Sequence, residues 1–299
     1  MSEHAVVLMA YGSPERLEDV PAYYADIRGG RPIRPELMDD LVARYRALGI
    51  DEGSPLNAIT EATRAALERE LALPVFTGMR HWQPRIAEAA ERALAGGATT
   101  VVGLVLAPHY SSMSIAKYRA LLEDALAGRS ELRFVESWGE EAGFIAVLSQ
   151  RVTMLTRGHE GRHVVFTAHS LPARILAEGD PYEEQLLRTA ELVAAEAGVD
   201  EWSFSFQSES ATGEPWLGPD ILDHLGALHE QGVRDVLLCP VGFVADHLEI
   251  RWDLDTEAVQ RAAELGMTLE RIEMPNAAPE FVRTLATIVR RALGVPSPA

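Results

Sequence analysis

A short apolar run that ends in polar residues stands at 163-HVVFTAHSLP-172. The residues from Val164 to Ala168 show no clean alternation of polar and apolar side chains, which is typical of a parallel strand buried on both faces. His169 follows the run directly, so we expect it where the strand ends, at the rim of a cleft. This stretch therefore predicts both a class of fold and a first position for chemistry.

Seven further runs of the same kind are spaced along the chain. They occupy residues 5–10, 75–78, 100–107, 132–136, 202–207, 235–241 and 268–272. Between them lie amphipathic segments that begin or end at proline and glycine, as helices often do. These segments predict helices at 84–95, 114–127, 144–156, 182–197 and 279–293. Ser54-Pro55 predicts one more helix start, with serine as the N-cap and proline at the first helical position.

The alternation of strands and helices predicts right-handed parallel crossovers and therefore a doubly wound α/β architecture. Four of the predicted strands precede residue 140 and four follow residue 160. We expect two similar lobes, 1–140 and 141–299, each with a four-stranded parallel sheet flanked by helices. The last helix belongs to the second lobe but could pack back on the first. The helical stretch 18–50 does not fit a minimal strand–helix–strand unit, and we expect it to cover a cleft.

The composition argues against several classes of function. The chain has 45 acidic and 27 basic residues and a formal net charge of −18, whereas nucleic-acid binding needs a basic surface. The single cysteine, Cys239, allows neither an internal disulfide nor an iron–sulfur cluster held by about four thiolates of one chain. The chain shows neither the roughly 20 apolar residues of a membrane span nor a signal-peptide pattern. We therefore expect a cytoplasmic protein without an integral membrane segment.

Polar side chains follow four of the predicted strands, where ligands bind in open α/β sheets. Tyr11 follows the first, His109 the third and His169 the fifth, and the seventh leads into the segment 240–249. A histidine at a strand end suits acid–base chemistry or metal binding. A structural histidine that is hydrogen-bonded to the backbone is the alternative at His169.

The segment 246–257 is rich in carboxylates. It contains Asp246, Glu249, Asp253, Asp255 and Glu257. On a helix the spacing 246, 249, 253, 257 puts four of them on one face, where like charges repel unless a cation or solvent offsets them. Oxygen ligands in a row favour a divalent cation, and a solvated acidic helix face is the alternative.

Familiar catalytic motifs are missing. The sequence has no glycine-rich dinucleotide or phosphate loop, no nucleophile elbow, and no H-E-x-x-H or C-x-x-C motif. Two α/β lobes without a nucleotide motif leave a cleft that binds a metal or a small ligand as the hypothesis.

Five separated motifs resemble those of the ferrochelatase family. The histidine motif is Ala168–Pro172 and the glutamate motif is Val241–Glu249. The other three are Trp216–Asp220, Leu106–Ser111 and Ser54–Leu56, in the same chain order. The resemblance implies a chelatase-like fold of two Rossmann-like lobes around a porphyrin cleft. It also implies that Fe²⁺ is a substrate, with no organic cofactor.

The resemblance assigns roles to single positions. His169 and Glu249 would face each other at the porphyrin centre and bind or deliver Fe²⁺, and His169 could instead take a pyrrole proton. Asp253, Asp255 and Glu257 would continue outward as an acidic path for the metal.

The resemblance also indicates the type of porphyrin. Tyr11, in Met9-Ala10-Tyr11-Gly12, is similar to the tyrosine of bacterial coproporphyrin III ferrochelatases, on the face opposite the histidine and axial to product iron. The propionates of a tetra-anionic porphyrin need cations or hydrogen-bond donors. The side chains that match such positions are Arg28, Arg44, Tyr45, Ser54 and Tyr118.

Three readings of the function stay open at this point. The first is insertion of Fe²⁺ into coproporphyrin III by a monomer that hands the product to a coproheme decarboxylase. The second keeps the fold but uses protoporphyrin IX or another divalent metal. The third, from another class, is a two-lobed protein that binds an anionic metabolite without turnover.

Overall fold

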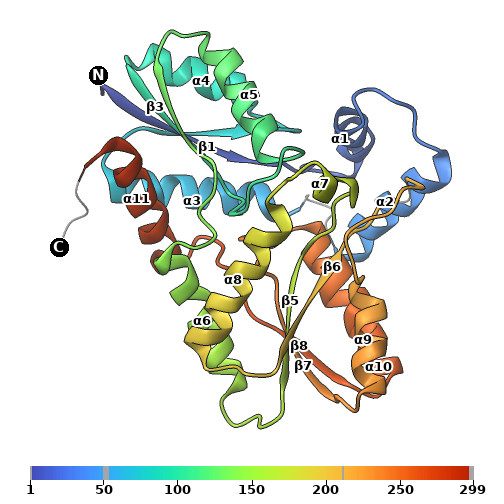
Figure 1. Cartoon of the computed structure of the whole chain (residues 1–299). Helices are drawn as coiled ribbons and strands as arrows, with labels where there is room; N and C mark the ends of the chain where they lie inside the picture. Colours follow the sequence, from blue (N-terminus) through green and yellow to red (C-terminus); the bar gives the residue numbers. More distant parts are fainter. Residues whose placement is uncertain (1, 50–53, 211, 296–299) are drawn as a thin grey trace.

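The computed structural model describes residues 2–49, 54–210 and 212–295, which form two parallel sheets (Figure 1). The first sheet has the strand order β2-β1-β3-β4 and the second the order β6-β5-β7-β8. The strands are β1 (His4–Ala10), β2 (Val75–Met79), β3 (Thr100–Val105), β4 (Glu131–Val135), β5 (His163–His169), β6 (Trp202–Gln207), β7 (Asp235–Cys239) and β8 (Thr268–Arg271). All neighbouring strands are parallel, which confirms the predicted class of fold.

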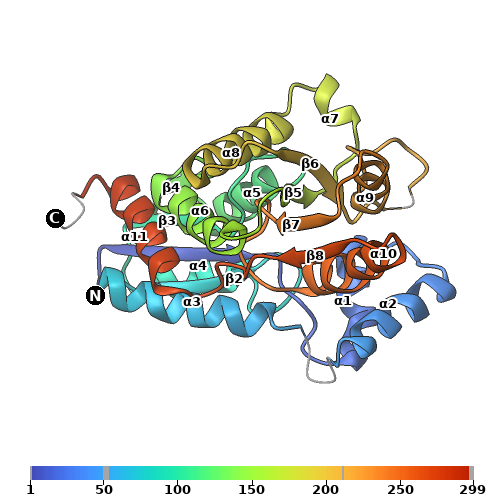
Figure 2. The same cartoon turned by 90° about the horizontal axis from the view of Figure 1, so that it is seen from below.

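Helices flank both sheets, as Figure 2 shows from below. Those associated with the first sheet are α3 (Leu56–Leu71), α4 (Ile86–Ala95) and α5 (Ile115–Leu126). Those associated with the second are α6 (Ala142–Thr156), α7 (Arg174–Ala177), α8 (Tyr182–Ala197), α9 (Ile221–Glu230) and α10 (Val259–Glu264). The central strands β1, β3 and β5 are almost completely buried, as expected of runs without polar alternation.

The last helix, α11 (Pro279–Leu293), packs against α3 of the first lobe and α6 of the second. Arg290 donates to the backbone carbonyl of Glu70 at 2.7 Å, and Arg291 forms a two-pronged ion pair with Glu141 at 2.6 and 2.8 Å. The apolar face of α11 packs in a buried cluster that includes residues of both sheets. The two lobes therefore share one core along this helix.

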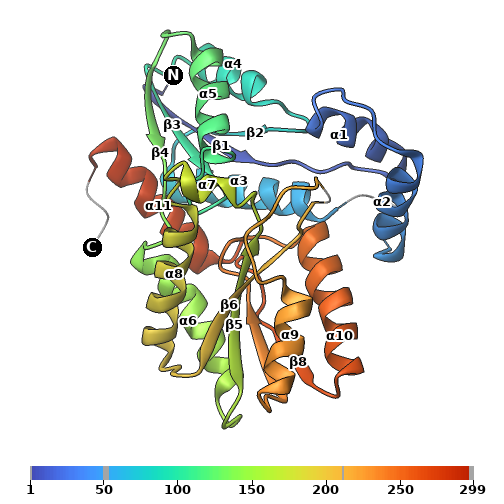
Figure 3. The ribbon, with the colours of Figure 1, turned by 45° about the vertical axis from the view of Figure 1, so that its right-hand side comes forward.

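The stretch before α3 forms a short 3₁₀ turn (Leu17–Asp19), α1 (Val20–Ile27) and α2 (Pro35–Ala47). Figure 3 shows α1 and α2 extending from the first sheet toward the α10 side of the second lobe. They have a small core of their own around Val20 and Tyr45, and Leu248 of the second lobe packs against it. This segment is named the cover below. Among the described residues no helix is long and apolar enough to cross a membrane.

Two local predictions were wrong. Ser54 is not the N-cap of α3, because Pro55 occupies that position and the Ser54 hydroxyl accepts only a long 3.4 Å bond from the Leu56 amide. The segment 246–257 is not one regular α-helix. It becomes helical near Leu248 and runs as a π-helix from Ile250 to Ala258 before α10. Asp246 therefore precedes the helix.

Candidate active site

The ends of β5, β6 and β7 bring the histidine and glutamate motifs together. The amide of Gly242, just after β7, donates to the carbonyl of Thr167 on β5 at 3.2 Å. Gln207, at the end of β6, pairs in register with His169. Its buried side chain accepts from the Thr167 hydroxyl at 3.1 Å and donates to the Glu249 carbonyl at 3.2 Å. Gln207 thus ties the backbone of Glu249 to the strand that carries His169.

The Trp216–Asp220 motif is hydrogen-bonded to the backbone and side chains that directly follow β5. The Ser170 hydroxyl donates to the Leu217 carbonyl at 2.7 Å, and the Leu217 amide donates to the Leu171 carbonyl at 2.8 Å. The Tyr182 hydroxyl donates to the carbonyl of His169 at 3.0 Å. These bonds fix the backbone on which the imidazole of His169 stands.

His169 and Glu249 face each other beyond the strand ends of the second sheet. Nε2 of His169 lies 3.6 Å from Oε1 of Glu249, and the side chains are 31% and 34% exposed. Nδ1 of His169 contacts the Ser170 carbonyl, which can only accept, so Nδ1 carries a hydrogen. In the neutral imidazole the lone pair is therefore on Nε2 and points toward the carboxylate.

This separation suits one shared cation. If a divalent metal lay about 2.1 Å from each donor atom, the N–metal–O angle would be about 120° at this N···O spacing. In the part of the chain that the structure describes, no group of three or more His, Cys, Asp or Glu side chains is arranged to hold a metal ion. The geometry therefore offers a two-donor site with room for further ligands from solvent or substrate.

A second histidine contacts the other oxygen of the same carboxylate. Nε2 of His247 lies 3.6 Å from Oε2 of Glu249, while its Nδ1 donates to the Ala245 carbonyl at 2.9 Å. Burial works against charge on His247, but the hydrogen bond and charge of Glu249 outweigh it and raise the imidazole pKa. Burial likewise opposes ionisation of Glu249, but the charges of His169 and His247 hold its pKa below the usual range. Glu249 is thus ionised between two imidazoles.

Asp253 and Glu257 continue from Glu249 along the π-helix. Burial, followed by the charge of Glu249, raises the pKa of Asp253 to about 7, and the charge of Glu257 adds to this effect. The Ser208 hydroxyl donates to Asp253 and partly opposes the shift. Three of the four carboxylates predicted on one face therefore lie near one another.

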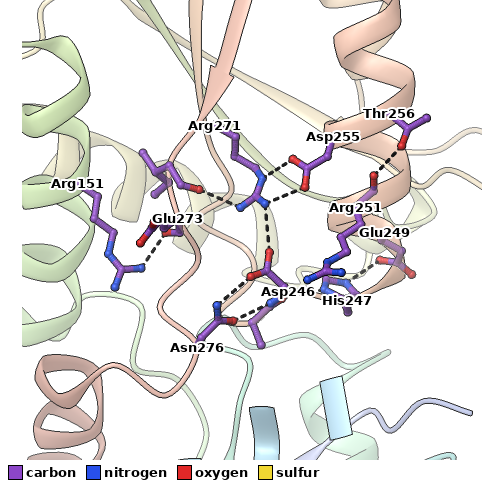
Figure 4. Close-up of polar contacts among 12 residues, drawn as sticks. Arg151, Asp246, His247, Glu249, Arg251, Asp255, Thr256, Arg271, Glu273 and Asn276 are labelled. Carbon is purple, nitrogen blue, oxygen red and sulfur yellow. Dashed lines mark hydrogen bonds and ion pairs between the residues drawn. The ribbon is translucent and has the colours of Figure 1, made fainter. Parts of the chain in front are cut away.

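Asp246 and Asp255 are turned to another partner (Figure 4). The Arg271 guanidinium contacts both oxygens of Asp255 at 2.7 and 2.9 Å and Asp246 at 3.1 Å. Asn276 completes the cluster, since its side chain donates to Asp246 at 2.8 Å and accepts from the Asp246 amide at 2.9 Å. The prediction that Asp246 shares a face with Glu249 was wrong, and Asp255 is held in an ion pair outside the Glu249–Asp253–Glu257 row.

Tyr11 stands on the first lobe, directly after β1, and its side chain is partly open. Burial, followed by the charge of Glu249, raises the pKa of its phenol, so the two side chains feel each other electrostatically. Its ring contacts His81, with centroids 4.6 Å apart. Tyr11 of the first lobe is thus near enough to Glu249 of the second for the carboxylate charge to act on its phenol.

The remaining side chains predicted to contact the substrate differ in burial and in their present partners. Arg28 is half-buried, and its guanidinium donates to the carbonyls of Arg31 and Pro32 at 3.4 and 3.2 Å. Arg44 pairs with Asp40 at 3.0 Å and lies 5.4 Å from the Trp252 ring.

Three others are buried in this structure. Tyr45 belongs to the core of the cover, and Ser54 begins the turn into α3. The guanidinium of Arg80 lies over the ring of Tyr118, 5.5 Å from the ring centre. Two of these residues lie near the acidic row, since the charge of Arg44 lowers the pKa of Asp253, and burial together with the charge of Glu249 raises the pKa of Tyr45.

Sequence reasoning missed His247 and Gln207. His247 lies inside the glutamate motif two residues before Glu249, and that spacing was the available signal. Gln207 ends a strand next to the histidine strand, which only the strand order reveals.

Comparison with known proteins gives the family of the chain. A family model described as Ferrochelatase matches residues 3–293. A protein named Ferrochelatase from Deinococcus radiodurans is 42% identical over 301 residues, covering 96% of this chain and 95% of that protein. A protein named Coproporphyrin III ferrochelatase from Bacillus subtilis is 40% identical over 304 residues, covering 97% of each.

Two solved structures share the fold at low sequence identity. SirB from Bacillus subtilis with Fe³⁺ has a TM-score of 0.63 at 12% identity and covers 97% of this chain and 96% of its own. CbiX, described as the terminal enzyme of sirohaem biosynthesis in denitrifying bacteria, has a TM-score of 0.57 at 15% identity and covers 96% and 99%. The whole-chain match and the relatives at about 40% identity decide the matter: this chain belongs to the ferrochelatase family.

Proposed function

We propose that the chain inserts Fe²⁺ into coproporphyrin III, with His169 and Glu249 at one face of the macrocycle and Tyr11 at the other. The observation that carries this proposal is the 3.6 Å approach of His169 Nε2 to Glu249 Oε1. His169 ends β5 and Glu249 lies in the first helical turn after β7, both in one lobe, while Tyr11 comes from the other lobe. A flat ligand between the lobes would meet donors on both faces.

The carboxylate of Glu249 and the imidazole of His169 offer different chemistry, and this divides the work between them. Glu249 has a lowered pKa and stays ionised, so its carboxylate suits the binding of Fe²⁺ and the removal of its water ligands. In its neutral form His169 has its lone pair on Nε2, and this form can accept a pyrrole proton. His247 contacts the second oxygen of Glu249 and can carry the proton onward.

Asp253 and Glu257 supply the approach for the metal. A carboxyl group with a pKa of about 7 exchanges its proton for a cation at little cost near neutral pH. Oxygen ligands of this kind hold a divalent ion weakly enough to release it toward the nitrogen-rich porphyrin. We leave Asp255 out of this path because Arg271 neutralises it.

The coproporphyrin assignment rests on two supports. Several relatives at about 40% identity carry the name Coproporphyrin III ferrochelatase. Tyr11 supplies a phenol oxygen that an iron porphyrin can take as an axial ligand. Arg28 and Arg44 are cations on the cover that could turn toward propionates, although Arg28 would first have to release two backbone carbonyls.

The test is anaerobic metallation of purified protein with Fe²⁺ and either coproporphyrin III or protoporphyrin IX, followed by porphyrin absorbance. We expect coproporphyrin III to be metallated with the higher kcat/KM. Faster metallation of protoporphyrin IX would reject the assigned substrate while keeping the enzyme. No metallation of either porphyrin would reject iron insertion itself.

A further inference from the structure

The helix α1 grips the segment around Tyr11 through two residues of one face. The Tyr23 hydroxyl donates to the carbonyl of Gly12 at 2.9 Å. One turn later, Asp26 accepts a hydrogen bond from Nδ1 of His81 at 2.8 Å. Because residues three apart share a helix face, both contacts point from the cover toward the end of β1.

Arg85 holds the same carboxylate from the other side. Its two terminal nitrogens contact Asp26 at 2.8 and 3.1 Å, and one of them also donates to the carbonyl of Arg80 at 2.9 Å. The hydrogen bonds from Arg85 lower the pKa of Asp26 despite partial burial, so the carboxylate is ionised. A two-pronged arginine–carboxylate contact fixes orientation as well as distance.

His81 transmits this orientation to Tyr11. Its backbone amide donates to the Tyr11 carbonyl at 2.9 Å, and its ring lies 4.6 Å from the Tyr11 ring at an angle of 52°. The His81 side chain is only 12% exposed, so it has little room to turn once Asp26 holds Nδ1. The ring of Tyr11 therefore packs against an imidazole that Asp26 of the cover holds in place.

We propose that Asp26, His81 and Arg85 form a positioning clamp that sets the direction of the Tyr11 phenol. These residues act through Tyr11, whose role as an iron ligand rests on the proposed function. The clamp links the cover to the first lobe, so the position of α1 and the aim of the phenol change together.

The clamp is tested first without porphyrin or metal. Protein labelled with ¹³C in its tyrosine rings is compared in the wild type, Asp26→Ala and Asp26→Asn, and the Tyr11 signal is identified by its loss in Tyr11→Phe. We expect the Tyr11 signal to move and broaden in Asp26→Ala and to move less in Asp26→Asn, which keeps an acceptor for His81. An unchanged Tyr11 signal in Asp26→Ala would overturn the proposal.

Two further variants keep the test decisive. Glu18→Gln removes the same charge from the cover, where Glu18 pairs with the exposed Arg16, and should leave the Tyr11 signal as in the wild type. Arg85→Gln loosens Asp26 without removing it and replaces Asp26→Ala if that variant does not fold. A Tyr11 signal that moves equally in Glu18→Gln would contradict a specific clamp.

A second measurement separates the clamp from the proposed function. With ferric coproporphyrin III bound, Asp26→Ala should shift the absorption spectrum in the same direction as Tyr11→Phe, and should add nothing in the double variant. If Tyr11→Phe leaves this spectrum unchanged, the ligand role of Tyr11 fails, while the ring signals of the free protein still decide the clamp.

Discussion

Gly242 lies against Ala168 so closely that a Cβ at position 242 would be 2.5 Å from the Cβ of Ala168 and 2.9 Å from its Cα. This contact seats the glutamate segment directly beside the residue that precedes His169. A side chain at 242 would force two backbones apart, because the obstacle is not a flexible side-chain end. Because Gly242 has no Cβ, the two segments can approach closely enough for the observed spacing between His169 and Glu249.

Gly242→Ala should lower both stability and activity. Overpacking at a rigid contact costs about 1–3 kcal/mol, and the shift should widen the distance from His169 to Glu249. Urea unfolding and metallation rates measure the two effects. The control is Gly226→Ala on α9, where the nearest atom to the new carbon is a terminal nitrogen of Arg261 at 3.4 Å. Equal behaviour of the two variants would refute the role given to the close contact.

Arg271→Lys should loosen the segment that carries Glu249. A lysine cannot reproduce the fork that holds Asp246 and Asp255 together, so we expect a loss of about 1–3 kcal/mol and slower metallation. Thermal unfolding and kcat measure this. The matched control is Arg261→Lys, because Arg261 forms a longer ion pair, with Glu264 at 3.7 Å. Unchanged kcat and stability in Arg271→Lys would show that the ion pairs in Figure 4 do not hold the site.

The acidic row should give the stability a pH dependence near neutrality. The pKa of Asp253 is raised to about 7 in the folded chain, mainly by burial, against about 3.9 in an unfolded chain. The folded state therefore binds the proton more tightly. The resulting stabilisation is complete below about pH 4 and is lost as the pH rises through 7.

Asp253→Asn removes this titration. The variant should become more stable relative to the wild type as the pH is raised from about 5 to about 8, by roughly 2–3 kcal/mol. Urea unfolding at several pH values measures the difference. Asp124→Asn, on the exposed face of α5, removes a charge far from the row and serves as the control. A difference between Asp253→Asn and wild type that stays constant with pH would contradict the raised pKa.

Tyr11→Phe should separate product binding from catalysis. The phenol oxygen is lost while the ring contact with His81 is kept. We expect the absorption of the bound iron porphyrin to change, whereas the rate of insertion falls by less than about tenfold. Stopped-flow absorbance follows both in one experiment. An unchanged product spectrum would mean that Tyr11 is not an axial ligand.

Much of the fold could be predicted from local patterns. Buried parallel strands read as short apolar runs, and all eight predicted strands exist with ends that differ by two residues or fewer. The π-helix from Ile250 to Ala258 could not be predicted, because the carboxylate spacing in this segment is that of one face of an ordinary α-helix. The partner of Asp255 was also hidden, since Arg271 lies 16 residues further along the chain.

The candidate site was partly predictable for a similar reason. His169 could be placed from its position after a strand, and Glu249 from the motif. Their separation depends on the strand order β6-β5-β7-β8, which no local pattern contains. His247 joins them because the turn after Gly242 brings its imidazole beside Glu249.

The central claim is that His169 and Glu249 act together on porphyrin and metal. The most direct measurement is single-turnover metallation of enzyme-bound coproporphyrin III, followed by stopped flow for the wild type, His169→Ala and Glu249→Gln. Each variant is first shown by fluorescence titration to bind the free porphyrin. We expect near-normal porphyrin binding and a loss of insertion by about 100-fold or more in both variants. Insertion at near wild-type rate in either variant would contradict the central claim.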